Sequence, residues 1–206
     1  MENKDNPLFF SAHLDDYQYS ENLNAALNNT RSLGLSVPQF TVDFGFIPDL
    51  EVLYERAEDI VYLEKHDPKN LDNPPAFNCL HYAQQVWTGL QKFYNRPLLL
   101  TSGYVLGNGR KTFYEPLATL ASRLEKPSDK RINLHVWVTL PDFTIVDPTL
   151  IFSLRFVGAA NSQSAKDILI RNVREQHMRE EHCYQPVLVG REYWDKASIK
   201  PYVFPS

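Results

Sequence analysis

Cys79 is the residue whose type and position most favour nucleophilic chemistry. It follows Asn78, a good helix N-cap, and lies in the first turn of the stretch Asn78–Tyr94, in which apolar residues recur at helical spacing. The unpaired N–H groups and the macrodipole of a helix N-terminus stabilise a thiolate, which is the reactive form of cysteine. The alternative is a small buried hydrophobe, because free cysteines are among the most buried residues. Taken alone, Cys79 fits the buried alternative better.

His135 supplies a candidate general base later in the chain. It lies early in an expected strand and shares one strand face with Trp137 and Thr139. A lone histidine on a strand is more often structural than catalytic. A cysteine followed by a histidine and then by an acid is, however, the order expected for thiol-dependent acyl transfer. Asp147, at the end of the next expected strand, is that acid.

The length of the hairpin loop decides whether the histidine and the acid can meet. Pairing of Thr139 with Phe143 across a three-residue loop places His135 directly opposite Asp147, because the two strands are antiparallel. A two-residue loop at Pro141-Asp142 places them on opposite faces instead. The spacing therefore permits the pair on condition of an odd-length loop or a bulge.

The three residues have distinct roles in such chemistry. Cys79 would attack a carbonyl carbon, and His135 would take the thiol proton and later protonate the leaving group. Asp147 would hold the histidine tautomer and stabilise the imidazolium. Candidates for oxyanion donors are the backbone N–H of Cys79 and the side chains of Asn78 and Asn73.

Three segments resemble the transglutaminase-like (papain-like) superfamily. Residues 135–149, HVWVTLPDFTIVDPT, resemble its histidine and aspartate motif, with an aromatic two residues after the histidine and a terminal Asp-Pro-Thr. Residues 77–83, FNCLHYA, are similar to its nucleophile helix, although the family often has Gly where this chain has Asn78. Residues 101–105, TSGYV, are similar to the strand between these motifs. The resemblance covers residues 77–149.

This resemblance implies a papain-like core, in which a helix that bears the nucleophile packs on an antiparallel sheet. It also implies the triad Cys79–His135–Asp147, with Trp137 and Tyr104 as candidates for the walls of the site. The substrate does not carry over, because the superfamily includes cross-linking enzymes, deamidases, proteases, amidases and inactive members. The Arg-Gly-Gly sequence of arylamine acetyltransferases and the paired cysteines of peptide glycanases are absent here.

The pattern of the remaining chain predicts the elements that must position these residues. Helices concentrate early and strands late, which predicts the α+β class with an antiparallel sheet and extra N-terminal helices. We expect one domain over 1–206, with an N-terminal helical arm at 1–70, a catalytic core at 71–157 and C-terminal completing elements at 158–206. The expected helices are 20–33, 49–61, 78–94, 115–125 and 164–181, and the expected strands are 97–106, 132–140, 143–146, 151–157, 185–189 and 200–204.

Composition excludes several classes of protein. The 206 residues are 43% hydrophobic and 22% charged, which are ordinary globular values and exclude general disorder. The net charge of −4 and the absence of a basic run predict no nucleic-acid partner. The polar N-terminus and short apolar runs predict neither a secretory signal nor a membrane partner, so we expect a cytoplasmic protein, with signal-independent export as an open alternative.

No cofactor is expected, because the proposed nucleophile, base and acid are all side chains. His177, His182 and Cys183 lack the spacing of metal ligands, so no metal is expected either. The function predicted from the sequence is thiol-dependent acyl transfer on a peptide or protein amide, by hydrolysis, deamidation or transfer to an amine. The alternative is an inactive transglutaminase-like fold that binds a protein or peptide.

Overall fold

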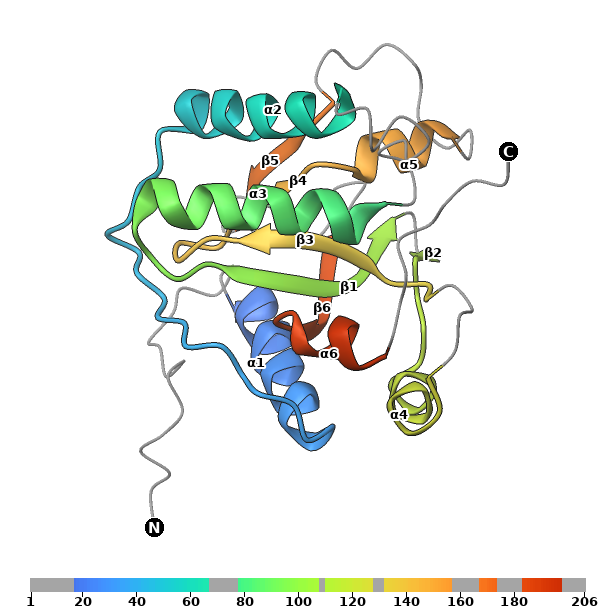
Figure 1. Cartoon of the computed structure of the whole chain (residues 1–206). Helices are drawn as coiled ribbons and strands as arrows, with labels where there is room; N and C mark the ends of the chain where they lie inside the picture. The colour runs from blue at the N-terminus through green and yellow to red at the C-terminus, as the bar shows by residue number, and fades with distance from the viewer. Residues whose placement is uncertain are drawn as a thin grey trace.

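A six-stranded antiparallel sheet with helices on both faces forms the framework of the molecule (Figure 1). The computed structural model describes residues 17–66, 78–107, 110–127, 132–156, 167–173 and 183–197. The described helices are α1 (Tyr17–Ser32), α2 (Leu50–His66), α3 (Cys79–Tyr94), α4 (Leu117–Glu125), α5 (Leu150–Phe156) and α6 (Glu192–Lys196). The described strands are β1 (Leu99–Gly107), β2 (Arg110–Thr112), β3 (His135–Thr139), β4 (Thr144–Asp147), β5 (Leu169–Asn172) and β6 (Cys183–Val189).

Strand β1 is the centre of the sheet and has three antiparallel partners. It pairs with β3 over residues 99–103, with β2 over 105–107 and with β6 over 101–106. Because β6 overlaps both of the other pairings, it occupies one edge of β1, and β3 and β2 follow each other along the opposite edge. Strands β4 and β5 continue the sheet beyond β3. The expected α+β class with an antiparallel sheet is confirmed.

Helix α3 packs on β3 and β1 with the apolar face that the sequence predicts (Figure 1). Ala83, Val86 and Leu90 are fully buried on this face, because they recur at helical spacing. Phe93, expected in the same stripe, is exposed and lies under the guanidinium of Arg56 instead. The packing of α3 brings its first residue to the start of β3.

Helices α1 and α2 pack on different parts of the molecule: α1 on the sheet and α2 on helix α3. Helix α1 packs on β6, and its buried side chains share a core cluster with Trp137 from β3. It begins at Tyr17, three residues before the expected start, and ends at Ser32, just before Gly34, whose positive φ of 69° suits the glycine that often follows a helix. Helix α2 packs on the outer side of α3, and the side chain of Asp49 caps it as expected, by accepting the N–H groups of Glu51 and Val52.

The expected strand Ile151–Val157 is wrong, because residues 151–156 lie in helix α5. The carboxylate of Asp147 accepts the backbone N–H groups of Thr149 and Leu150 and so starts the helix. Leu150 and Leu154, one helical turn apart, are both buried. The apolar run is compatible with a strand or a helix. The hydrogen bonds that Asp147 accepts at the start of the run favour the helix.

The expected helix Ser164–Glu181 is also wrong over its described residues. Leu169–Asn172 form β5, which pairs with β4 through Ile145 opposite Arg171 and Asp147 opposite Leu169. Pairing with the free edge of β4 outweighs the local helical pattern. Residues 164–166 and 174–181 lie outside the described residues, as does the expected strand 200–204.

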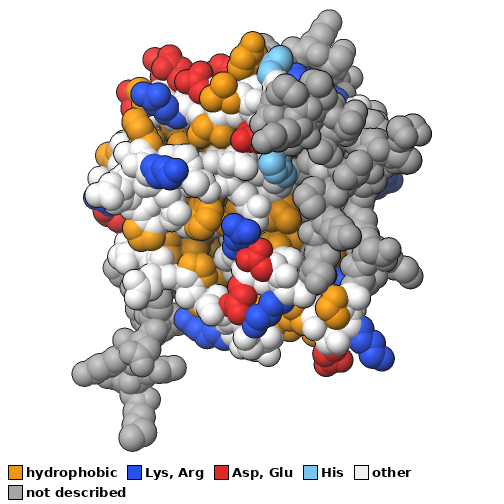
Figure 2. All heavy atoms as spheres, viewed as in Figure 1, with side chains coloured by type: hydrophobic (Ala, Val, Ile, Leu, Met, Phe, Trp, Pro, Cys, Tyr) orange, Lys and Arg blue, Asp and Glu red, His pale blue; other side chains and the backbone are white. Residues whose placement is uncertain are grey.

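The other expected strands and helices are present with shifted ends, and β2 and α6 were not expected. Within the described part of the chain, no helix combines the length and apolar character that a membrane crossing requires. Acidic side chains gather over α2 on the face drawn in Figure 2, whereas Lys and Arg are scattered there among other side chains.

Candidate active site

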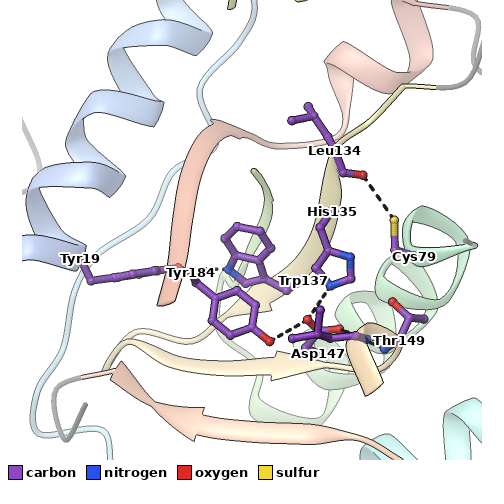
Figure 3. Close-up of polar contacts among 9 residues, drawn as sticks. Tyr19, Cys79, Leu134, His135, Trp137, Asp147, Thr149 and Tyr184 are labelled. Atoms are coloured by element: carbon purple, nitrogen blue, oxygen red, sulfur yellow. Dashed lines mark hydrogen bonds and ion pairs between the residues drawn. The ribbon is translucent and has the colours of Figure 1, made fainter. Parts of the chain in front are cut away.

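Three element ends bring Cys79, His135 and Asp147 together (Figure 3). Cys79 is the first residue of α3, His135 the first of β3 and Asp147 the last of β4. The imidazole Nε2 of His135 lies 2.5 Å from Oδ2 of Asp147, and both side chains are buried. The imidazole lies between the carboxylate and the thiol in Figure 3, and Cys79 is one of the groups that act on its charge.

The thiol of Cys79 is held at the start of β3. Its Sγ donates to the carbonyl oxygen of Leu134 at 3.7 Å, the residue directly before His135. Cys79 is half-buried, so it is the most accessible of the three side chains. An approaching reactant would therefore meet the sulfur first.

The hairpin that carries His135 and Asp147 has a different register from the expected one. Val138 pairs with Val146 and Thr139 with Ile145, so Asp147 falls opposite Trp137 rather than opposite His135. The expectation of direct opposition is therefore wrong. The two residues nevertheless share a face, because they are diagonal neighbours, and the carboxylate reaches the imidazole along that diagonal.

The turn explains this register. The loop has three residues, as required, but they are 141–143, because Leu140 N–H donates to the Thr144 carbonyl at 2.8 Å. Phe143 N–H donates to the Leu140 carbonyl and completes a tight turn. Phe143 adopts a φ of 68°, the left-handed conformation that this kind of loop needs at its last residue. Glycine is the usual residue at this position, so the phenylalanine gives no sequence indication of where the loop ends.

The carboxylate of Asp147 is saturated with hydrogen bonds. Its Oδ1 accepts the backbone N–H groups of Thr149 at 3.0 Å and Leu150 at 2.9 Å. Its Oδ2 accepts from His135 and from the phenol of Tyr184, the latter at 2.7 Å. A fully buried carboxylate is costly unless it is paired in this way. The four bonds fix its position and compensate for its burial.

Aromatic rings enclose the imidazole. Phe113 stacks on His135 with centroids 5.1 Å apart, and Trp137 stacks at 6.2 Å. Tyr184 meets Trp137 edge to face at 4.9 Å. The indole N–H of Trp137 donates to the hydroxyl of Tyr19 at 3.1 Å. These contacts hold the imidazole in one orientation and keep water from its ring faces.

Gly103 makes room for this arrangement. It is the register partner of His135 and lies where the pairing of β1 with β6 shifts by one residue. A Cβ at this position would lie 2.1 Å from the carbonyl oxygen of Gln185 and 2.9 Å from the indole ring of Trp137. Only a residue without a side chain fits.

The electrostatics favour an imidazolium–carboxylate pair. Burial is the largest influence on His135 and would lower its pKa, but the charge and hydrogen bond of Asp147, helped by Cys79, raise the pKa from 6.5 to about 10. Burial is also the largest influence on Asp147 and would raise its pKa. His135 and the hydrogen bonds from Thr149 and Tyr184 outweigh it and lower the pKa of the carboxyl below 3.8.

The candidate oxyanion donors have different outcomes. Cys79 begins α3, so its backbone N–H is among those that find no partner within the helix. Asn78 occupies the N-cap position as expected and is buried, but its side chain makes no capping hydrogen bond to the described residues of α3. Asn73 lies outside the described residues.

The two candidate wall residues also differ. Trp137 is fully buried behind the imidazole. Tyr104 is half-buried and meets Tyr114 edge to face at 5.1 Å, with the ammonium of Lys111 over both rings. Trp137 therefore supports the histidine from within, and Tyr104 lies closer to the surface.

Sequence reasoning missed Tyr184 and Phe113. Tyr184 belongs to β6, far along the chain, and Phe113 follows β2 with a φ of 62°. For Phe113, the only local indication of a role in the site is that an aromatic residue directly follows a short strand. Nothing near Tyr184 in sequence indicates an acid as its partner.

Two other candidates, His81 and Cys183, have partners of their own. Nε2 of His81 forms a hydrogen bond with Oε2 of Glu64 at 2.9 Å, in agreement with a structural or rim role. Cys183 begins β6 opposite Leu106, and His177 and His182 lie outside the described residues. Among the residues that the structure describes, no three His, Cys, Asp or Glu side chains group as metal ligands.

Comparison with family models, with curated proteins and with solved structures finds no match to this chain. The interpretation of the site therefore rests on its own geometry and chemistry.

Proposed function

We propose that this protein is a cysteine-dependent enzyme that transfers the acyl group of a peptide or protein amide through Cys79, His135 and Asp147. One observation carries the proposal: a partly exposed thiol at a helix N-terminus lies beside a buried histidine that is paired with a buried, fully hydrogen-bonded carboxylate. This combination of a nucleophile, a base and an orienting acid is the arrangement that thiol acyl transfer needs.

In the first half of the reaction, the sulfur of Cys79 attacks the amide carbonyl carbon and a C–S bond forms. His135, which holds the proton of the thiol as an imidazolium, passes it to the leaving nitrogen as the C–N bond breaks, which releases an amine. In the second half, water or a second amine attacks the thioester and gives its proton to His135. The C–S bond then breaks and the thiol is restored.

Asp147 supports both halves of the reaction without changing its protonation state. Its charge stabilises the imidazolium of His135, and its Oδ2 fixes which imidazole nitrogen faces it. The other imidazole nitrogen is then left for the thiol. The raised pKa of His135 is consistent with an imidazolium that persists at neutral pH and can protonate the leaving nitrogen.

The start of α3 would stabilise the oxyanion. With the substrate carbonyl carbon against the sulfur, the backbone N–H of Cys79 and the positive end of the helix dipole would face the charge that develops on the carbonyl oxygen. The packing of α3 on the antiparallel sheet supports a transglutaminase-like (papain-like) core. The segments that form this packing are those whose sequences resemble that superfamily.

A second candidate function is a non-catalytic binding module that keeps these residues for packing. The burial of His135, which is 1% exposed, and the hydrogen bond of the thiol to the Leu134 carbonyl favour it. In that case the His135–Asp147 pair would serve only the stability of the fold.

Iodoacetamide labelling at different pH values distinguishes the two functions. An activated Cys79 reacts well below pH 8.5, whereas an ordinary thiol does not, and Cys183 in the same chain is the internal comparison. His135→Gln should remove the advantage of Cys79 over Cys183. Equal reactivity of both cysteines in the wild type would exclude the enzyme and favour the binding module.

A further inference from the structure

Tyr184 contacts the proposed triad from a strand that contributes no member to it. Its phenol donates to Oδ2 of Asp147 at 2.7 Å, and Oδ2 is also the atom that His135 contacts. Both Tyr184 and Asp147 are buried, and Figure 3 shows the phenol and the imidazole approaching the carboxylate from different sides. One carboxylate oxygen therefore has two side-chain partners.

The phenol remains a donor across the pH range in which a protein is folded. Burial is the largest cause, and together with Asp147 it raises the pKa of Tyr184 well above 10. The O–H group thus stays protonated, and the carboxylate can only accept from it. Its edge-to-face contact with Trp137 fixes the ring, and its pairing opposite Val105 fixes the backbone.

The two oxygens of Asp147 are held by different parts of the fold. Backbone N–H groups at the start of α5 hold Oδ1, which leaves Oδ2 as the working oxygen. A carboxylate with a single partner on Oδ2 could rotate about its side-chain bond or take up a proton more readily. The phenol opposes both changes, because it adds a second direction of attachment and a donor that favours the ionised form.

We propose that Tyr184 is a positioning residue of the active site, which holds Oδ2 of Asp147 toward His135 and keeps the carboxylate ionised when His135 serves Cys79. This inference deepens the proposed function and rests on it. Tyr184 acts through Asp147 and contacts neither the sulfur nor the reacting carbonyl.

The charged and titratable groups around this pair come from several elements. His135 lies on β3 and Cys79 on α3, Arg171 on β5 acts on the charge of Tyr184, and Tyr19 on α1 does so more weakly. A change in the phenol alone leaves all of these groups in place. Its effect on the pH dependence of the thiol can therefore be assigned to Asp147.

The test is the rate of Cys79 alkylation by iodoacetamide between pH 4 and 9 in the full chain. Tyr184→Phe removes one hydroxyl and keeps the ring. We expect the acid limb to move up by about one pH unit and alkylation on that limb to be slowed roughly tenfold, because a carboxylate held less firmly toward His135 stabilises the imidazolium less.

Tyr193→Phe is the matched control. Its hydroxyl is also buried, but it donates to the backbone carbonyl of Leu120 and has no contact with Asp147. The same chemical change should leave the alkylation profile at its wild-type position. A similar shift in both variants would overturn the proposal, since it would reflect general loosening of the core.

His135→Gln separates failure of this inference from failure of the proposed function. If His135→Gln leaves alkylation of Cys79 unchanged, the triad itself falls. If His135→Gln slows alkylation and Tyr184→Phe does not shift the profile, only the role of Tyr184 is overturned.

A second measurement tests the proposal on the wild-type protein, in case Tyr184→Phe does not fold. In the wild type, proton NMR should show a slowly exchanging Tyr184 hydroxyl with a cross-peak to the imidazole N–H proton of His135, because both protons point at Oδ2. A hydroxyl proton in fast exchange with water, with no such cross-peak, would overturn the proposal.

Discussion

His135 and Asp147 are diagonal neighbours in the β3–β4 hairpin, and the imidazole Nε2 still lies 2.5 Å from the carboxylate Oδ2. Trp137 occupies the position directly opposite the acid. The arrangement lets an indole ring support the imidazole from below while the carboxylate reaches it from the side.

We expect Cys79→Ala to abolish acyl-transfer activity, with a loss of at least about 10³-fold, because no other group can form the thioester. The side chain is half-buried and its hydrogen bond to the Leu134 carbonyl is long, so the free energy of unfolding should fall by less than about 1 kcal/mol. Urea denaturation and an amide-hydrolysis assay measure the two effects.

Cys183→Ser is the control for this prediction and should retain full turnover, since Cys183 lies at the start of β6 opposite Leu106. Activity that survives in Cys79→Ala would refute the proposed nucleophile.

Asp147→Ala should destabilise the fold strongly. It removes four hydrogen bonds and leaves His135 buried without its partner, and breaking such a buried pair costs about 3–5 kcal/mol. Asp147→Asn keeps the volume and can still accept the N–H groups that start α5. It should therefore be more stable than the alanine variant, yet lose roughly 10³-fold in activity, because it carries no charge for the imidazolium.

Chemical denaturation of both variants, together with turnover of the asparagine variant, checks this prediction. Equal stability of the two variants would argue against a role for Oδ1 in capping α5.

Gly103→Ala should destabilise the site without touching any triad residue. Its Cβ would meet the Gln185 carbonyl at 2.1 Å and the Trp137 ring at 2.9 Å, and a backbone atom cannot yield as a flexible side chain can. We expect a loss of about 2–4 kcal/mol and a changed tryptophan fluorescence.

Gly45→Ala is its control, because the nearest atom there is the flexible carboxylate of Asp43 at 3.2 Å. A Gly103→Ala variant as stable as Gly45→Ala would contradict the packing described here.

The sequence sufficed for the nucleophile helix because its information is local. The apolar residues of α3 recur at helical spacing, Asn78 precedes the first turn, and the N-terminal end carries Cys79. The hairpin was predicted only in part, since the left-handed residue of its loop is Phe143 rather than a glycine. An odd loop length sufficed to predict that His135 and Asp147 share a face of the sheet. It did not determine which residues pair across the hairpin.

What could not be predicted depends on partners distant in sequence. Leu169–Asn172 form a strand because β4, well before them in the chain, offers an edge. Tyr184 reaches the site only through the pairing of β6 with β1 and the irregularity at Gly103. No local pattern records these contacts.

The last prediction concerns the pH dependence of stability. Burial, the largest influence, opposes ionisation of both groups, but their mutual attraction prevails and raises the pKa of His135 to about 10 while lowering the pKa of Asp147. The folded-state pKa of His135 lies above the unfolded value of 6.5, so its contribution is complete below pH 6.5 and is lost as the pH rises toward 10. The folded-state pKa of Asp147 lies below 3.8, so its contribution is complete above pH 3.8 and is lost in stronger acid.

The pair should therefore stabilise the fold most between pH 3.8 and 6.5. The difference in unfolding free energy between the wild type and His135→Gln, measured in urea, should shrink steadily from pH 6.5 to pH 9. The buried tyrosines do not interfere in this range, because burial raises the pKa of Tyr19 and of Tyr193 to about 12. The other histidines are common to both proteins and cancel in the difference. A difference that stays constant over this range would mean that His135 is neutral in the folded protein, and the imidazolium–carboxylate pair would have to be abandoned.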